Sequence, residues 1–134
     1  MFPQIKLKRT DYKRIHRGKA DKPPMSGDTS YVSVPAIGWT DAQIAIAERY
    51  APKLTAVQFE LLVAMLTHGA RPIYELMPGS VVWLGGLDGK WRRDHGGKPV
   101  AIDTLNSMVT KGVLRRVDLP PVYGRKRWTW EVVE

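Results

Sequence analysis

The chain contains no cysteine in its 134 residues. A disulfide framework, a zinc site with thiolate ligands and a cysteine nucleophile are therefore excluded. Apolar runs are also short, since the longest, residues 61–66, falls far below the roughly 20 residues of a membrane-spanning helix. The first residues lack the apolar stretch of a secretory signal. We expect a cytoplasmic protein without a membrane partner, stabilised by packing and not by cross-links.

Residue patterns typical of catalysis and cofactor binding are scarce. The three histidines, His16, His68 and His95, lack the spacing of metal ligands, and no glycine-rich loop ends in Gly-Lys-Ser or Gly-Lys-Thr. Asp94, His95 and Asp103 could form an acid–base cluster, but Asp94 and His95 lie in a glycine- and lysine-rich segment where polar residues are expected in any case. We expect that the protein is not an enzyme and that it binds neither a metal nor a cofactor.

Positive charge is present in excess: 21 Lys and Arg residues stand against 13 Asp and Glu residues, which gives a net charge of +8. The positive residues are clustered. Residues 1–22 hold eight basic and two acidic side chains, and two further basic groups occupy residues 90–98 and 111–127. Clustered cations are typical of proteins that bind a polyanion such as nucleic acid.

Residues 1–35 are predicted to form a basic flexible arm followed by a linker. They contain few large aliphatic residues, and two prolines in the stretch 22–28 forbid a continuing helix. Residues 31–34 favour one short edge strand. A flexible basic arm can follow a polyanion, with Tyr12 and His16 placed to stack on bases, and a merely solubilising tail is the alternative.

Residues 36–134 are predicted to form one α+β domain with three well-delimited helices. Thr40 and Thr55 each occupy an N-cap position, and Gln43 and Gln58 follow three residues later to complete two capping boxes. Apolar residues recur at helical spacing after both caps and again before Gly112. The three expected helices cover residues 40–50, 56–67 and 100–111.

A short helical turn and a β-hairpin are expected between the second and third helices. Residues 72–77 are predicted to form the turn. Residues 81–84 have the composition of a buried strand, and the Asp-Gly pair at 88–89 is typical of a tight hairpin turn. Trp83 and Trp91 would then lie on the two strands of this hairpin and contribute to the core.

A second hairpin, with a basic tip, is predicted at the end of the sequence. Residues 113–117 and 125–133 have the character of two antiparallel strands. Trp128 and Trp130 alternate with polar residues such as Thr129. This alternation is that of a half-buried strand, with the tryptophans facing the core and Thr129 facing solvent.

A helix, a glycine and a basic hairpin in this order resemble the recognition helix and wing of winged-helix proteins. Residues 104–116, Thr-Leu-Asn-Ser-Met-Val-Thr-Lys-Gly-Val-Leu-Arg-Arg, are similar to a stretch of winged helix-turn-helix regulators, including MarR-like ones. Residues 54–62, Leu-Thr-Ala-Val-Gln-Phe-Glu-Leu-Leu, resemble the opening helix of that family. The resemblance covers residues 54–134. It departs from the family at residues 80–99, which intervene where a short second helix leads into the recognition helix.

The resemblance implies a winged-helix-like α+β domain with an inserted β-hairpin, preceded by the basic arm. It further implies a small DNA-binding transcriptional regulator of bacterial or phage type, with the recognition helix in a major groove and the wing on the backbone. Asn106 and Ser107 are the best candidates for base contacts, and ordinary solvated side chains are the alternative. The predicted nucleic-acid-binding residues are Thr104, Asn106, Ser107, Lys111, Arg115, Arg125, Lys126, Arg127, Arg92 and Arg93.

A protein-interaction module on a winged-helix frame is the alternative function. Such a module would act as an inhibitor or adaptor of a host enzyme, with its basic surface facing an acidic partner. One continuous basic face favours nucleic acid, whereas an exposed apolar patch elsewhere favours a protein partner. Duplex DNA is the expected partner, and the choice between DNA and RNA and the oligomeric state, a dimer included, stay open.

Overall fold

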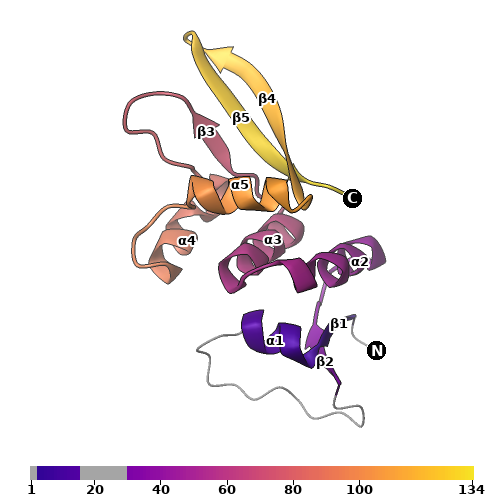
Figure 1. Ribbon diagram of the computed structural model, residues 1–134. Helices are drawn as coiled ribbons and strands as arrows, with labels where there is room; N and C mark the ends of the chain where they lie inside the picture. Colours follow the sequence, from indigo (N-terminus) through magenta and orange to yellow (C-terminus); the bar gives the residue numbers. More distant parts are fainter. Residues whose placement is uncertain (1–2, 16–29) are drawn as a thin grey trace. The chain divides into compact units, whose positions relative to one another are not determined.

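The structure, a computed structural model, describes residues 3–15 and 30–134 and divides into two compact units, Met1–Thr67 and His68–Glu134. The described residues form five α-helices and two small antiparallel sheets (Figure 1). The predicted α+β class is therefore confirmed. The boundary between the two units falls at the end of the second predicted helix.

The first unit begins with a folded β-ribbon. Strand β1 (Gln4–Lys8) leads directly into the short helix α1 (Arg9–Ile15), and β1 pairs antiparallel with β2 (Tyr31–Pro35). Exposure alternates along β1, where Ile5 and Leu7 are buried between exposed neighbours. This alternation is that of a strand with one face against a core. The short strand expected at residues 31–34 is thus confirmed.

The prediction of a flexible arm is wrong for the described part of residues 1–35. The few apolar residues of this segment include Tyr12, Ile15 and Val32, which are all buried in the core of the first unit. Because Tyr12 is buried, its ring is not available to stack on a base. The other predictions made for this segment, on His16 and on the loop at 22–28, lie outside the described residues.

The helices of the first unit begin at the predicted caps. The backbone N–H of Gln43 donates to Thr40 Oγ1 at 3.2 Å, and Gln43 Oε1 accepts from the Thr40 N–H at 2.8 Å. Thr55 and Gln58 form the same reciprocal pair at 3.3 and 3.1 Å. Both capping boxes are confirmed, together with the two helices that they start. The elements are α2 (Asp41–Tyr50), the 3-10 turn η1 (Ala51–Lys53) and α3 (Ala56–His68).

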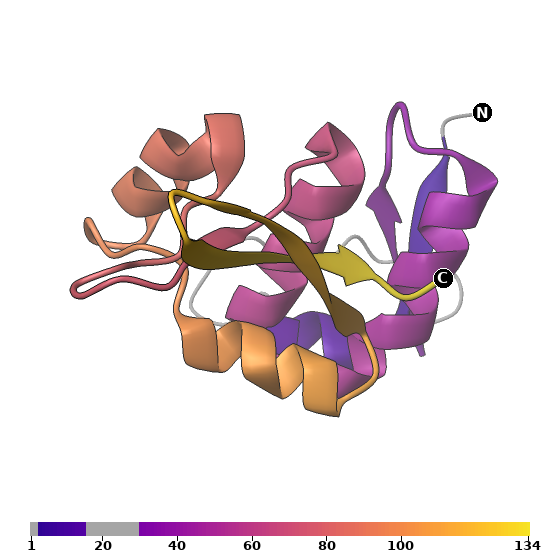
Figure 2. The same ribbon diagram turned by 90° about the horizontal axis from the view of Figure 1, so that it is seen from above.

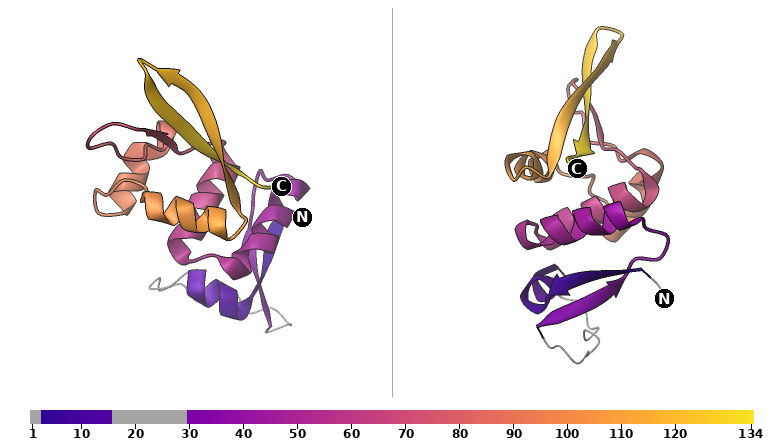
Figure 3. Two further views of the ribbon diagram at one scale, coloured as in Figure 1. Left: turned by 45° about the horizontal axis from the view of Figure 1, so that its top comes forward. Right: turned by 90° about the vertical axis from the view of Figure 1, so that its right-hand side faces the viewer.

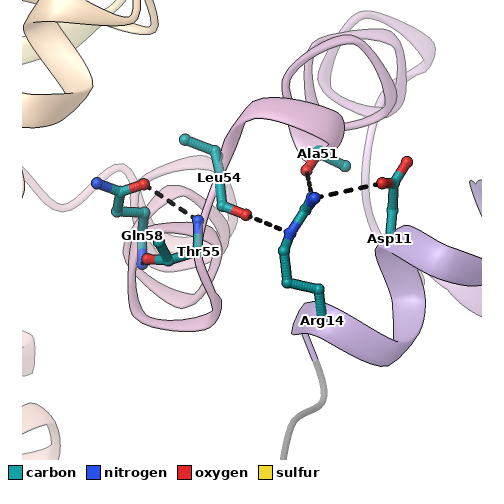
Figure 4. A network of polar contacts seen from close by, with 6 residues as sticks. All are labelled: Asp11, Arg14, Ala51, Leu54, Thr55 and Gln58. Carbon is teal, nitrogen blue, oxygen red and sulfur yellow. Dashed lines mark hydrogen bonds and ion pairs between the residues drawn. The ribbon is translucent and has the colours of Figure 1, made fainter.

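A basic side chain of α1 joins this helix to the connection between α2 and α3 (Figure 4). The guanidinium of Arg14 donates to the carbonyl oxygens of Ala51 at 2.6 Å and Leu54 at 3.0 Å, and it lies 3.5 Å from the carboxylate of Asp11. The Ala51 carbonyl also accepts the Leu54 N–H at 3.3 Å, so the guanidinium adds a charged donor at the end of α2, where a cation is favourable. Arg14 therefore acts as a structural residue of the first unit.

The second unit is built on a three-stranded antiparallel sheet in the order β3-β5-β4. Its strands are β3 (Ile73–Glu75), β4 (Leu114–Val122) and β5 (Arg125–Val132). The predicted terminal hairpin is confirmed as β4 and β5, which continue beyond the last β3 pair, Glu75 with Arg127 (Figure 1). Figure 2 shows the two strands twisting about each other, as strands of L-residues do.

Two predictions about the sheet are wrong. The helical turn expected at residues 72–77 is strand β3, because Ile73 exchanges backbone hydrogen bonds with Trp83 on one side and β3 pairs with β5 on the other. Thr129, expected to face solvent, is only 2% exposed, because β5 is the central strand. Its hydroxyl donates to the carbonyl oxygen of Pro72 at 2.6 Å.

The predicted middle hairpin is also wrong, because a helix replaces its turn. Residues 85–94 form the 3-10 turn η2 (Gly85–Leu87) and helix α4 (Asp88–Asp94). The carboxylate of Asp88 accepts the backbone N–H of Leu84 at 3.3 Å and pairs with Arg92, one turn later, at 2.6 Å. These contacts favour a helix start over a hairpin turn.

The two tryptophans of the predicted middle hairpin differ in burial. Trp91 is buried on α4 and stacks on the ring of His95, with ring centroids 4.0 Å apart. Trp83 is 51% exposed, so the expectation that it belongs to the core is wrong. Its backbone pairs with Ile73, while Val82 and Leu84 on either side of it are buried.

The third predicted helix is confirmed as α5 (Ile102–Thr110). Leu105 and Met108 are fully buried on one face. The helix stops two residues before Gly112, whose φ is +79°. The N–H of Gly112 donates to the Val109 carbonyl and the N–H of Val113 to the Met108 carbonyl, each at 3.0 Å. This pair of bonds is a Schellman motif, which requires a left-handed residue such as glycine.

Candidate nucleic-acid interface

All ten residues predicted to bind nucleic acid lie in the second unit. Nine of them belong to α4, α5 and the β4–β5 hairpin, and the tenth, Lys111, is the C-cap residue of α5. Figure 3 shows the hairpin rising from the end of α5 and projecting away from that helix. A projecting hairpin next to a helix offers a ligand two surfaces at once.

The tip of the hairpin is a two-residue turn. Tyr123 and Gly124 both have positive φ, +52° and +75°, and Val122 pairs with Arg125 across them. Positive φ at both central residues is the geometry of a type I′ turn, which matches the twist of the flanking strands. Just below the turn, the register shifts between Leu119 and Val122, so that a β-bulge is present there.

The hairpin is basic, but several of its cations already have partners. Over residues 114–132 it has five basic and two acidic side chains. Arg115 pairs with Glu131, while Arg125 lies 3.6 Å from the carboxylate of Glu75 and donates to the sulfur of Met77 at 3.6 Å. These pairs are solvent-exposed, and exposed pairs contribute little stability, so a phosphate can compete for the same cations.

Lys126 and Arg127 are the hairpin cations whose side chains make the fewest contacts with other residues. Within the described residues, neither side chain has a hydrogen bond, ion pair or ring contact. Lys126 is exposed and Arg127 is half-buried. Their positive charge is available to a polyanion without first breaking a protein contact.

Arg116 was not predicted, although it is a prominent cation of the hairpin. Its guanidinium lies over the ring of Trp128, 3.9 Å from the centroid, and 3.3 Å from the carboxylate of Asp118. Tyr74 packs on Trp128 from β3, with ring centroids 4.8 Å apart. The register could have indicated this contact, since Arg116 and Trp128 fall on the same face of the two paired strands.

On α5 the predicted contact residues occupy the face opposite the core. Asn106 is exposed and its backbone carbonyl accepts the hydroxyl of Thr110 at 3.1 Å. Thr104, Ser107 and Lys111 are half-buried at the sides of this face. The helix therefore presents short polar side chains, of which Asn106 projects most freely, and such side chains can reach base edges.

The two predicted residues of α4 differ in their surroundings. Arg92 is held by Asp88 one turn earlier, whereas Arg93 is exposed and has no partner among the residues that the structure describes. Lys90 is exposed on the same helix. Helix α4 thus adds free positive charge just before α5 in the chain.

His95, a member of the acid–base cluster considered from the sequence, has contacts within the second unit. Its Nδ1 lies 2.8 Å from the carbonyl oxygen of Trp91, on whose ring it stacks. Residues 3–15 and 30–134 contain no group of three or more side chains suited to hold a metal ion. In the same residues no helix is both long and apolar enough to cross a membrane. The absence of enzymatic activity and of cofactors stays a prediction.

Comparison of the chain with protein-family models, with curated proteins and with solved structures gave no match. The function is therefore argued from the residues and their geometry.

Proposed function

We propose that the second unit, His68–Glu134, binds duplex DNA in the manner of a winged helix-turn-helix domain and acts as a transcriptional regulator of bacterial or phage type. In this proposal α5 is the recognition helix and the β4–β5 hairpin is the wing. The observation that carries it is the projecting basic hairpin, on which the side chains of Lys126 and Arg127 have no protein partner among the described residues. Phosphate recognition needs little more than positive charge on a reachable surface.

The presence of α4 supports this proposal. The family pattern has a short helix before the recognition helix, and the sequence predicted a hairpin in its place. The seven-residue helix α4 now stands before α5, joined to it by residues 95–101. Asn106 is proposed to contact base edges, and Thr104, Ser107 and Lys111 to contact bases or phosphates at the sides of the same face.

A salt titration tests the proposal. Fluorescence anisotropy with a random-sequence duplex, repeated at several salt concentrations, should show binding at low salt that weakens by orders of magnitude as salt rises. The logarithm of the binding constant should fall linearly with that of the salt concentration, with a slope near −0.9 for each phosphate neutralised. Absence of binding at low salt would contradict the proposal.

One observation favours the alternative, a protein-interaction module. Four large apolar residues between β3 and η2 are exposed, and large exposed apolar patches are typical of protein interfaces. They are Leu76, Met77, Val81 and Trp83. The same titration separates the two functions, because a protein that docks only on an acidic protein partner will show no salt-dependent binding to the duplex.

A further inference from the structure

Tyr123 stands at the apex of the β4–β5 hairpin and is 95% exposed, more than any other large hydrophobic residue of the described chain. Its ring has no contact with another ring or cation among residues 3–15 and 30–134. Exposing a whole aromatic side chain brings no gain in packing. Packing within the fold therefore does not explain why a tyrosine occupies this position.

The geometry of the turn does not explain the presence of a tyrosine either. Its φ of +52° lies in the left-handed region, where a side chain with a Cβ is disfavoured and where asparagine or glycine is the usual first residue of a type I′ turn. A bulky residue in this conformation is strained relative to glycine or asparagine. Strained residues of this kind are found preferentially at functional sites.

The paired strands of the hairpin hold Tyr123 in place at the turn. Val122 and Arg125 pair directly beneath the turn, and the side chain of Arg125 contacts Glu75 and Met77 of the neighbouring segment. Two cations, Arg125 and Lys126, directly follow the turn at the start of β5, and Lys126 is exposed. An exposed aromatic ring next to positive charge is the combination with which proteins stack on the bases of single-stranded nucleic acid.

We propose that Tyr123 stacks on an unpaired base, so that the preferred ligand of this domain is DNA in which a duplex adjoins a single-stranded segment. This inference rests on the proposed function, because it assumes that the hairpin lies against DNA. The bases inside a closed duplex are stacked on one another and offer no free face. A base in an overhang offers such a face without the cost of opening the duplex.

The test compares two ligands and two substitutions in the full chain. The first ligand is a labelled duplex with a short single-stranded overhang, and the second is an unlabelled, relaxed, covalently closed circular duplex used as competitor. Tyr123→Asn removes the ring and places the preferred Asn-Gly pair in the turn, so its thermal midpoint should equal or exceed that of the parent. Tyr123→Trp keeps a ring that can stack.

Tyr123→Asn should weaken binding to the overhang duplex about 5- to 150-fold, the range expected for one base–aromatic stack. Tyr123→Trp should retain parental affinity. Competition by the closed circle should change less than about twofold, and the salt slope should not change because no cation is removed. A 2-aminopurine placed in the overhang should be quenched by the parent and by Tyr123→Trp, but not by Tyr123→Asn.

Two results would overturn the inference while leaving the proposed function intact. In the first, Tyr123→Asn binds both ligands as the parent does, with the usual salt dependence. In the second, it loses affinity for the closed circle as much as for the overhang duplex, so that the ring contacts paired DNA. A parent that binds neither ligand at low salt would overturn both proposals.

Discussion

Arg14 donates a hydrogen bond from its guanidinium to the carbonyl oxygen of Ala51 at 2.6 Å. Ala51 begins the 3-10 turn that ends α2, and the same guanidinium reaches Leu54 beyond that turn. A residue counted among the cations of a DNA-binding arm thus satisfies carbonyl groups inside the first unit. The basic N-terminal segment is, in this part, an element of the fold.

Arg14→Ala should destabilise the first unit. The substitution removes two hydrogen bonds from a charged donor and leaves two carbonyl groups without it, so we expect a loss of about 1.5–3 kcal/mol in the free energy of unfolding. Lys13→Ala is the matched control, since Lys13 is an exposed neighbour on the same helix and should change stability by less than about 0.5 kcal/mol. Chemical denaturation measures both. Equal midpoints would contradict the structural role.

Leu105→Ala and Trp130→Ala should each destabilise the second unit. Both side chains are at most 1% exposed, and truncation of such residues costs about 2–5 kcal/mol through lost burial and the cavity left behind. Asn106→Ala, next to Leu105 on the exposed face of α5, serves as the control and should be near neutral. Thermal melts measure the change in stability of each variant. Midpoints equal to that of the parent within error at both core positions would show that the register of the helix and hairpin is wrong.

Gly89→Ala distinguishes helix α4 from the hairpin that the sequence suggested. Within a helix the added Cβ meets nothing within 4 Å, and alanine should stabilise the protein by roughly 0.5–1 kcal/mol. In an Asp-Gly type I′ turn the glycine would need positive φ, and the same substitution would destabilise it. Gly112→Ala is the contrasting variant, because φ is +79° there and a loss of about 1–2 kcal/mol is expected. The sign of the two stability changes is the measurement.

Removing Lys126 and Arg127 together should lower the salt dependence of DNA binding. If each contacts one phosphate, Lys126→Ala with Arg127→Ala should reduce the magnitude of the salt slope by about two. Arg125 is left in place because it pairs with Glu75.

Arg49→Ala with Lys53→Ala is the control for this experiment, since it removes one arginine and one lysine from exposed positions of the first unit. The control should keep the parental slope. An unchanged slope in the hairpin variant would show that the hairpin does not bind phosphate in the manner of a wing.

Local sequence was sufficient for the elements whose stabilising contacts fall within one turn or one hairpin. Thr40 and Thr55 form hydrogen bonds with glutamines three residues away. The two hydrogen bonds that end α5, from Gly112 to Val109 and from Val113 to Met108, join residues three and five positions apart. Strands β4 and β5 pair across a two-residue turn, so they too are neighbours in the chain. Such signals are readable because both partners stand close together in the chain. These local signals specify the fold and not the function, since the same polar and basic residues also occur on ordinary solvated surfaces.

Tertiary structure decided the features that depend on partners far away in the sequence. Thr129 is buried because β3, more than 50 residues earlier, pairs with β5 and its neighbour Pro72 accepts the hydroxyl. Residues 4–15 fold because their few apolar side chains find a core and Arg14 finds carbonyl groups 37 and 40 residues later. In both cases the local segment is ambiguous, and the free energy of a non-local contact selects its conformation.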